Sequence, residues 1–203
     1  MKPRLLAIVG SQRKNGNSYS LAKAVFDSVD MDSEIVQLAD REIKFCTVCE
    51  KCVNGDCVLR DDLNEILAEM QKADGIVFVL PKYLFSSSKF LAFLERLDSI
   101  VHMRRHMGYC GPPKNPDYTL FSKNPFGIFA LSGRGKFPKA TLRTVKDYIE
   151  STGLTPVLYD SPPFIAVNVK SGDEKGEVLG NKAALKRCMN LTQKVIASSK
   201  ARQ

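Results

Sequence analysis

Short apolar runs recur along this chain, and each is followed by a stretch whose apolar residues have helical spacing. Three of the runs, residues 5–9, 76–80 and 126–131, contain only apolar residues and glycine, which is typical of parallel strands buried on both faces. The predicted strands are residues 5–9, 34–39, 76–80, 126–131 and 154–159, with 164–169 as an added edge strand. The alternation of strand and helix predicts an α/β protein whose parallel sheet carries helices on both faces.

Signals for helix ends punctuate the segments between these strands. Asn17 or Ser18 is predicted to cap one helix, and Asp62 followed by Glu65 has the spacing of a capping box. Pro138 is predicted to be the first residue of another helix. The remaining predicted helices are residues 87–106 and a tail that begins at Asn181.

Length and composition bound the domain organisation. With 203 residues, 44% of them hydrophobic, residues 1–203 are predicted to form a single domain with a substantial core. Residues 108–124 are rich in glycine, proline and asparagine and are predicted to form a long excursion from it. No apolar run approaches the ~18 residues that a membrane span needs, and the start of the chain lacks the pattern of a signal peptide. We therefore expect a cytoplasmic protein with no membrane partner.

Four of the six cysteines lie within twelve residues, with the spacing C-x2-C-x2-C-x4-C. They are Cys46, Cys49, Cys52 and Cys57, in a cluster-binding loop predicted over residues 44–60. Thiolates select iron–sulfur clusters, zinc or copper(I), and this spacing is similar to the C-x2-C-x2-C-x3-C-P run of bacterial ferredoxins. We predict one [4Fe-4S] cluster held by the four thiolates, with a compact zinc site or two disulfides as alternatives. A reducing cytoplasm favours a metal over disulfides.

Three loops follow the carboxyl ends of predicted strands, where parallel sheets bind ligands. Residues 10–18 offer hydroxyl, amide and guanidinium groups before a helix N-terminus, which favours a phosphate. Residues 81–86 offer apolar and aromatic side chains that suit a planar ring, and residues 132–137 contain two glycines that permit close approach. A phosphate at one end and a planar ring at the other describe a mononucleotide, for which FMN is the best candidate.

The formal net charge of +8 raises the question of a nucleic-acid partner. The basic residues are scattered through the sequence, and an anionic cluster together with a flavin phosphate would offset part of their charge. We therefore do not expect nucleic-acid binding. An anionic redox partner is another use for the residual charge.

Two motifs together give the chain a resemblance to a known family. Residues 10–18 resemble the loop GSPRxNGNT, with Gln12 in place of proline and Ser18 in place of threonine, and the compact cysteine motif follows the second strand. Residues 81–86 and 93–96 are similar to a PVYFGSxS…FIDR region. Over roughly residues 4–165 the chain thus resembles the iron–sulfur flavoproteins of archaea and anaerobic bacteria, in the NADPH-dependent FMN reductase-like branch of the flavodoxin-like fold.

The resemblance implies a three-layer sandwich whose five-stranded parallel sheet has the order 2-1-3-4-5, with helices on both faces. It also implies which residues bind FMN. For the phosphate they are Ser11, Arg13, Asn15, Asn17 and Ser18, and for the isoalloxazine ring and its surroundings Pro81, Lys82, Tyr83, Leu84, Ser86, Ser132 and Gly133. Because Lys82 replaces the family's usual valine, we hypothesise that its cation stabilises an anionic reduced flavin.

The resemblance further implies an oxidoreductase that transfers electrons between a ferredoxin-like carrier, or a small-molecule redox substrate, and an unknown acceptor or donor. It implies a homo-oligomer, a dimer or tetramer, in which the cluster of one subunit lies near the flavin of another. The alternatives are an NAD(P)H-dependent FMN or quinone reductase whose cysteines bind structural zinc, and a non-enzymatic zinc module that binds nucleic acid. No catalytic triad or catalytic histidine is needed for electron transfer, and none is predicted.

Overall fold

The computed structural model describes residues 3–53, 56–83, 85–106, 115–133, 138–157, 166–170 and 174–201. Strands and helices alternate along these residues as predicted. In chain order the elements are β1 (Arg4–Val9), α1 (Asn17–Phe26), β2 (Asp32–Gln37), η1 (Leu38–Asp40), η2 (Lys51–Val53), α2 (Leu63–Lys72), β3 (Gly75–Pro81), α3 (Ser88–Arg105), β4 (Pro125–Ser132), α4 (Lys139–Ser151), β5 (Thr155–Pro156), β6 (Ala166–Lys170), η4 (Glu177–Gly180) and α5 (Lys182–Lys200).

The strands form one parallel sheet with the order β2-β1-β3-β4-β5, which confirms the predicted order. The edge beside β4 is divided between two short strands. Thr155 and Pro156 of β5 pair with the first residues of β4, and β6 pairs with residues 128–132 further along it. Proline has no N–H to donate to the ladder, so β5 pairs only briefly. β5 and β6 therefore lie one after the other along the same side of β4, and β6 does not form a separate strand beyond β5. Residues 158–165 lie outside the described residues.

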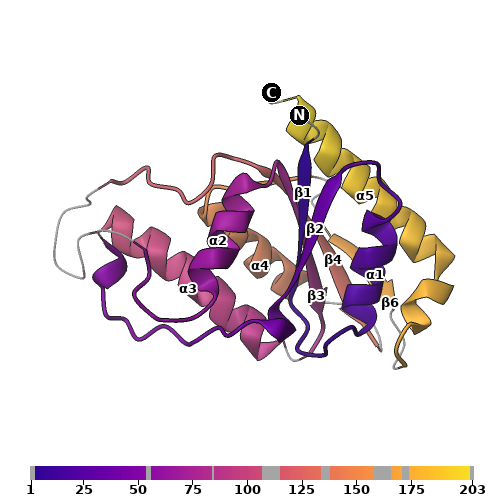
Figure 1. Ribbon diagram of the computed structural model, residues 1–203, viewed down its shortest axis with the longest axis horizontal. Helices are drawn as coiled ribbons and strands as arrows, with labels where there is room; N and C mark the ends of the chain where they lie inside the picture. Colours follow the sequence, from indigo (N-terminus) through magenta and orange to yellow (C-terminus); the bar gives the residue numbers. More distant parts are fainter. Residues whose placement is uncertain are drawn as a thin grey trace.

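Helices cover both faces of the sheet, as Figure 1 shows: α1 and α5 lie on one side, and α2, α3 and α4 on the other. Because successive side chains of a strand point to opposite faces, β1 contributes to two cores. Leu6 and Ile8 join the core under α2, α3 and α4, whereas Leu5, Ala7 and Val9 join the core under α1 and α5.

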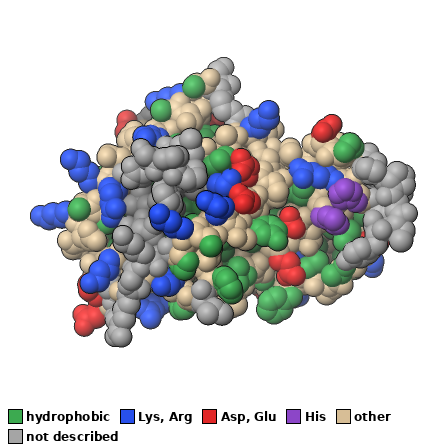
Figure 2. Space-filling model, turned by 180° about the vertical axis from the view of Figure 1, so that it is seen from behind, with side chains coloured by type: hydrophobic (Ala, Val, Ile, Leu, Met, Phe, Trp, Pro, Cys, Tyr) green, Lys and Arg blue, Asp and Glu red, His purple; other side chains and the backbone are tan. Residues whose placement is uncertain are grey.

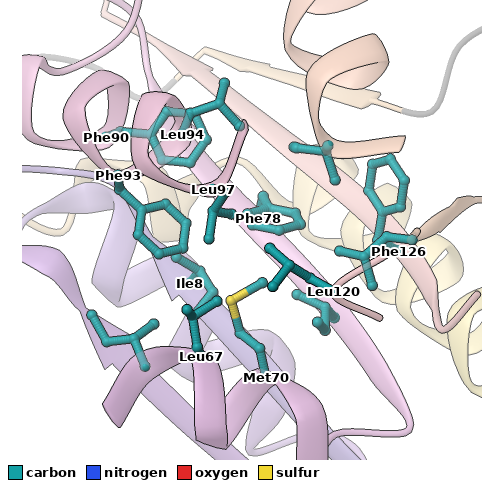
Figure 3. Close-up of a cluster of buried hydrophobic side chains, with 14 of the residues drawn as sticks. Ile8, Leu67, Met70, Phe78, Phe90, Phe93, Leu94, Leu97, Leu120 and Phe126 are labelled. Atoms are coloured by element: carbon teal, nitrogen blue, oxygen red, sulfur yellow. The ribbon is translucent and has the colours of Figure 1, made fainter. Parts of the chain in front are cut away.

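Aromatic rings fill the first of these cores (Figure 3). Phe78 of β3 makes edge-to-face contacts with Phe90 of α3 and Phe126 of β4, with ring centroids 6.3 Å and 5.9 Å apart. Such pairs contribute about 0.5–1.5 kcal/mol beyond the burial of their area. They join the start of α3 to the centre of the sheet, so the residues just before α3 are held on a rigid base.

The caps predicted at α1 and α2 are wrong, whereas side chains cap α3 and α5. Ser87 Oγ accepts from Phe90 N at 3.1 Å at the start of α3, and Asn181 Oδ1 accepts from Ala184 N at 3.1 Å at the start of α5. The N-cap of α1 is Gly16, with no side-chain cap, since Asn17 is already the first helical residue.

The predicted capping box at α2 does not form. Asp62 occupies the N-cap position, but it makes no side-chain capping bond. Its carboxylate instead accepts from Glu42 N at 2.7 Å, which fixes the incoming chain of the cysteine loop. Leu63 N donates to Asp61 Oδ1 at 3.2 Å, so a different carboxylate satisfies this helix terminus.

The described part of the predicted excursion, residues 115–124, packs against the body of the protein. Leu120 and Phe121 are buried, and their N–H groups donate to Thr152 O at 2.8 Å and 3.1 Å. Gly153 has a φ of +102°, and a Cβ there would lie 2.3 Å from Phe121 O, so only glycine fits. Residues 107–114 lie outside the described residues. Among the helices that are described, none combines the length and the apolar character of a membrane span.

Candidate cofactor sites

The loop between β1 and α1 begins against two neighbouring elements. Gly10 N donates to Val79 O of β3 at 2.9 Å, and Ser87 Oγ, beside α3, donates to Gly10 O. A Cβ at Gly10 would lie only 3.1 Å from the Phe90 side chain, so glycine permits this approach. The loop is therefore anchored where the carboxyl ends of β1 and β3 meet the start of α3.

The N-terminus of α1 has the features of an anion site. Its N-cap Gly16 provides no capping side chain, and the first turn contains no acidic residue. The first N–H groups of a helix have no partner within the helix, and its dipole favours negative charge there. Ser11 and Ser18 are both buried beside this terminus, and Ser11 Oγ accepts from Arg13 N at 3.1 Å. This arrangement suits a phosphate.

Two of the predicted phosphate residues have their amides engaged elsewhere. Asn15, with a φ of +50°, receives a hydrogen bond from Gln37 Nε2 at 3.3 Å and donates its own N–H to Gln37 Oε1 at 3.0 Å. Asn17 Nδ2 donates to Glu174 O at 2.8 Å, and Asn17 Oδ1 accepts from Gly176 N at 2.7 Å. These amides therefore shape the loop and join it to the segment before η4.

The two other predicted loops lie at the ends of adjacent strands. Lys82 N donates to Leu131 O at 2.7 Å, which joins the residue after β3 to the end of β4. Ser132 is buried at the end of β4, and Tyr83 is half exposed beyond β3. Pro81, the last residue of β3, and Gly133 border the same edge of the sheet. Leu84 and residues 134–137 lie outside the described residues.

Ser86 has a buried hydroxyl that lacks a partner. Its side chain is 4% exposed, and within the described residues nothing hydrogen-bonds to its Oγ. A buried polar group left unsatisfied costs about 1–3 kcal/mol. Because Ser86 follows β3 at the carboxyl edge of the sheet, its free hydroxyl fits a site that a polar ligand such as FMN completes.

The cysteine loop follows β2 and runs out beside α3 to η2 before the chain returns to α2 (Figure 1). The thiols of Cys46, Cys49, Cys52 and Cys57 line one cavity of about 20 Å³, together with Arg96, Ile100 and Met103 of α3. All five cysteines in the described part of the chain are free thiols, so no disulfide forms between them.

The backbone of the cysteine loop is strained in a way that directs N–H groups toward sulfur. Val48 and Glu50 have φ values of +49° and +58°, and a β-branched residue rarely adopts this region. Val48 N donates to Cys46 Sγ at 3.4 Å, and the N–H of Lys51 lowers the pKa of the Cys49 thiol. Alternation with left-handed residues produces concave arrays of N–H groups that bind anions. The loop therefore suits negatively charged sulfur.

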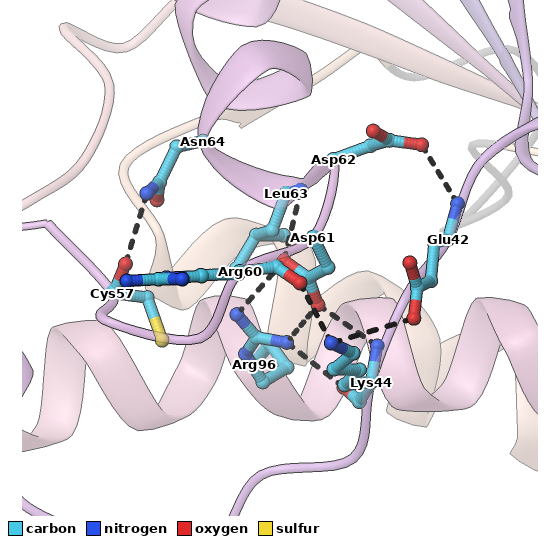
Figure 4. Close-up of polar contacts among 9 residues, drawn as sticks. All are labelled: Glu42, Lys44, Cys57, Arg60, Asp61, Asp62, Leu63, Asn64 and Arg96. Carbon is cyan, nitrogen blue, oxygen red and sulfur yellow. Dashed lines mark hydrogen bonds and ion pairs between the residues drawn. The ribbon is translucent and has the colours of Figure 1, made fainter.

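The backbone carbonyls of the other two cysteines accept hydrogen bonds from residues outside the loop. Asn64 Nδ2 donates to Cys57 O at 2.9 Å, as Figure 4 shows, and Arg104 Nε donates to Cys52 O at 3.1 Å. Burial raises the pKa of the Cys52 thiol, and the three neighbouring sulfurs raise it further, which indicates how close the four lie.

The cysteine cavity has the donor atoms of a metal site, but its thiols are not arranged as metal ligands. The donor set of four thiols around one cavity matches what iron–sulfur clusters and zinc require. Within the described residues, however, no group of three or more His, Cys, Asp or Glu is arranged as metal ligands. The cavity has room for about one water-sized occupant. The cavity as it stands is therefore smaller than a four-iron cluster.

Arg96 and Asp61 form a buried ion pair beside this cavity (Figure 4). Their side chains are each 1% exposed, and Arg96 Nη1 lies 2.6 Å from Asp61 Oδ2. Burial raises the pKa of Asp61, but hydrogen bonds from Arg96 and from the N–H groups of Lys44 and Leu63 outweigh it and hold this pKa below its usual value. Burial likewise lowers the pKa of Arg96, and Asp61 and Cys57 more than reverse this effect.

The two candidate sites lie at different positions along α3. The predicted FMN loops lie near its start, where Gln12 Nε2 donates to Ser88 Oγ at 2.6 Å, whereas the cavity is lined from Arg96 to Met103. At 1.5 Å per residue, this places the cysteine cavity roughly 12–22 Å along the helix from the FMN loops. The sites are therefore separate within one chain.

The sequence motifs do not predict the ion pair between Arg96 and Asp61. Residues 93–96 enter only as part of one such motif. A signal was present, because Arg96 lies three residues after Phe93 and four before Ile100, both on the apolar side of α3. A charged residue on a buried helix face needs a partner, but spacing alone does not identify it.

The sheet order and the helix layers define a flavodoxin-like α/β protein, with the three predicted cofactor loops at the carboxyl edge of its sheet. Solved structures agree on the fold: RosB, crystallised with 8-demethyl-8-formylriboflavin-5'-phosphate, superposes with a TM-score of 0.68 at 13% identity, covering 98% of this chain and 79% of RosB. The chain belongs to the NADPH-dependent FMN reductase family, whose pattern matches residues 3–152. It is therefore a redox flavoprotein of that family.

Several relatives of this chain carry the name iron-sulfur flavoprotein. The one from Methanosarcina thermophila is 27% identical over 200 residues, which cover 94% of this chain and 97% of that protein. One from Archaeoglobus fulgidus is 41% identical over 83 residues, which are 39% of this chain and only 41% of that protein.

Proposed function

We propose that this oxidoreductase holds FMN at the carboxyl edge of its sheet and a [4Fe-4S] cluster at Cys46, Cys49, Cys52 and Cys57. It would exchange electrons with a ferredoxin-like carrier or a small redox substrate. When bound, the flavin accepts electrons in pairs or singly and the cluster passes them singly. The observation that carries the proposal is the convergence of all four thiols of one motif on one cavity.

For FMN, the chain supplies complementary groups at the two ends of the nucleotide. The uncapped N-terminus of α1, with Ser11 and Ser18 buried beside it, would bind the phosphate. Ser86 would complete its hydrogen bonding through the cofactor, and Tyr83 and Lys82 would border the ring. The residues that the family resemblance predicts around FMN are therefore the proposed ligands.

For the cluster, the surrounding chain supplies hydrogen bonds and positive charge to sulfur. Val48 N already donates to Cys46 Sγ, and the buried Arg96 lines the cavity beside Cys57. Hydrogen bonds to the sulfurs and the net charge of the surroundings set cluster potentials. These groups thus favour thiolate ligands over neutral thiols.

The separation of the two sites along α3 supports a homo-oligomer in which the cluster of one subunit serves the flavin of another. Both site loops expose apolar side chains that a second subunit would cover. On the cysteine loop Phe45, Val48 and Val58 are 70%, 51% and 51% exposed, and after β3 Tyr83 and Phe85 are 52% and 55% exposed. Exposed apolar groups gathered at functional loops are typical of interaction surfaces.

The face of the protein seen in Figure 2 gives no support to a nucleic-acid function. On the face shown in Figure 2, Lys and Arg side chains are spread out and interspersed with acidic ones, with no continuous basic stripe. A basic stripe or patch is the electrostatic signature of a nucleic-acid site.

One observation favours a second candidate function. The cysteine cavity of about 20 Å³ suits a single ion better than a cluster. The alternative is therefore an NAD(P)H-dependent FMN or quinone reductase whose four cysteines hold structural zinc.

Anaerobic purification followed by analysis of metal, sulfide and flavin per chain distinguishes these functions. We expect about four iron and four sulfide with one FMN, and a broad visible absorption that dithionite bleaches. One zinc without sulfide would favour the alternative. A chain that takes up neither metal nor sulfide, even after anaerobic reconstitution, would contradict the proposal.

A further inference from the structure

Arg96 is the largest fully buried side chain in the described part of the protein, and its guanidinium is only partly satisfied. Nη1 donates to Asp61 Oδ2 at 2.6 Å and to Lys44 O at 2.9 Å, and Nη2 lies 3.4 Å from Asp61 Oδ1. Nε, in contrast, has no partner among the described residues. A buried charge-bearing donor without a partner is costly, so its persistence suggests a missing acceptor.

The acceptor that the cavity offers is sulfur. Arg96 and Cys57 line the same cavity, and Figure 4 shows Cys57 Sγ pointing toward α3 on the side from which Arg96 extends. Asn64 Nδ2 donates to the Cys57 carbonyl at 2.9 Å, which fixes the backbone of this cysteine while its side chain lines the cavity. A neutral thiol is a weak acceptor, whereas a metal-bound thiolate is a strong one.

We propose that Arg96 is a positioning residue of the cluster site, which Asp61 holds so that its Nε–H meets the sulfur of Cys57 once that sulfur is a cluster ligand. This inference rests on the proposed function. Arg96 would then favour the reduced cluster, because reduction adds negative charge beside a buried cation. Asp61 holds Nη1 at 2.6 Å and so sets the orientation of the guanidinium.

The test compares three forms of the reconstituted full-length protein. Replacing both partners, Arg96→Gln with Asp61→Asn, removes the charges without leaving one buried alone, which is tolerated better than breaking the pair. Arg96→Lys keeps a cation for Asp61 but replaces the planar guanidinium, and with it the Nε–H, by an ammonium group. Circular dichroism and FMN content establish that each variant is folded, and iron and sulfide content establish cluster loading.

The deciding readout is the cluster midpoint potential from an EPR-monitored titration. We expect the double variant to disfavour the reduced cluster about tenfold, a fall of about 59 mV for one electron. Arg96→Lys should lower the potential less and change the EPR signature through loss of the sulfur hydrogen bond. A purely structural role would change stability alone, with wild-type potential and signature.

The outcomes distinguish failure of the role of Arg96 from failure of the proposed function. Loaded variants with the wild-type potential and EPR signature would overturn the role of Arg96 and leave the proposed function standing. If the double variant does not fold, Arg96→Lys decides by the same two measurements. A wild-type chain that binds FMN but never iron and sulfide would overturn the cluster, and Arg96 with it.

Discussion

Asp61 and Arg96 are 35 residues apart in sequence, and they form an ion pair of 2.6 Å in which neither side chain is more than 1% exposed. The pair joins the end of the cysteine loop to the middle of α3. Breaking a buried pair by removing one partner is strongly destabilising, because the other charge remains buried without compensation. Several measurable properties depend on this contact and on the two candidate sites.

Asp61→Asn should destabilise the protein by about 3–5 kcal/mol near neutral pH. Because the pKa of Asp61 is lowered in the folded state, the pair contributes stability above the unfolded carboxyl pKa of about 3.9, and this stability is lost as pH falls through the folded pKa. Urea unfolding of both proteins near neutral pH and in acid measures this difference. The wild type should lose stability in acid more steeply than the variant.

Asp27→Asn is the matched control, since Asp27 pairs with Lys23 at 2.9 Å on the surface and is 63% exposed. Exposed pairs of this kind contribute only a few tenths of a kcal/mol. Equal effects of the two substitutions would show that burial of the Asp61 pair has no energetic consequence.

Cys57→Ala should abolish binding of the metal centre while the protein retains FMN, since the cysteine cavity lies roughly 12 Å or more along α3 from the FMN loops. Metal analysis and flavin content after anaerobic reconstitution measure the two effects separately. Cys188→Ala is the control: Cys188 is fully buried in α5, and burial raises its pKa to about 12. Loss of metal from the Cys188 variant, or full metal in the Cys57 variant, would contradict the assigned ligands.

Ser86→Ala should act in opposite directions on the apoprotein and on its complex with FMN. Removing an unsatisfied buried hydroxyl should leave the apoprotein equally or more stable, whereas loss of a hydrogen bond to FMN should cost about 0.5–1.5 kcal/mol of binding free energy. Thermal unfolding of the apoprotein and fluorescence titration with FMN measure these changes. Ser28→Ala, at the far end of α1, should not alter FMN affinity.

Lys82→Val should lower the midpoint potential of bound FMN, because a cation beside the ring would stabilise an anionic reduced flavin. The hydrogen bond from Lys82 N to Leu131 O survives the substitution, so the loop should keep its position. A spectroelectrochemical titration measures the potential. Lys194→Met is the control, because Lys194 lies beside Pro125, the first residue of β4, and so at the opposite end of the strands from Lys82. An unchanged potential in Lys82→Val would reject this role.

Much of the fold could be predicted because it depends on local patterns. The run from Leu5 to Val9 is a buried strand, since an apolar strand covered on both faces needs no polar side. The helices predicted over 87–106 and from Asn181 form, and Ser87 and Asn181 cap them through contacts between residues three apart. The caps predicted at Asn17 and Asp62 were wrong, because distant backbone groups compete for those side chains.

The candidate sites, too, could be predicted only where they depend on local sequence. The spacing of the cysteines indicated that four thiols share one loop, and the structure brings them around one cavity. Nothing in that spacing reveals the size of the cavity or the strained φ values of Val48 and Glu50, because both depend on how the loop packs on α3.

By itself, the sequence determined the order of strands and helices, the polar loop between β1 and α1 and the thiol motif, because periodicity and residue spacing are properties of neighbouring residues. Only the tertiary structure decided that Asn17 bonds to a segment 157 residues away and that Arg96 meets Asp61 beside the thiols. It also left the Ser86 hydroxyl without a partner among the residues that the structure describes. It also decided that the two sites lie at different positions along α3. Contacts between distant segments follow from packing a sheet between two helical layers, and no local pattern encodes which side chains that packing brings together.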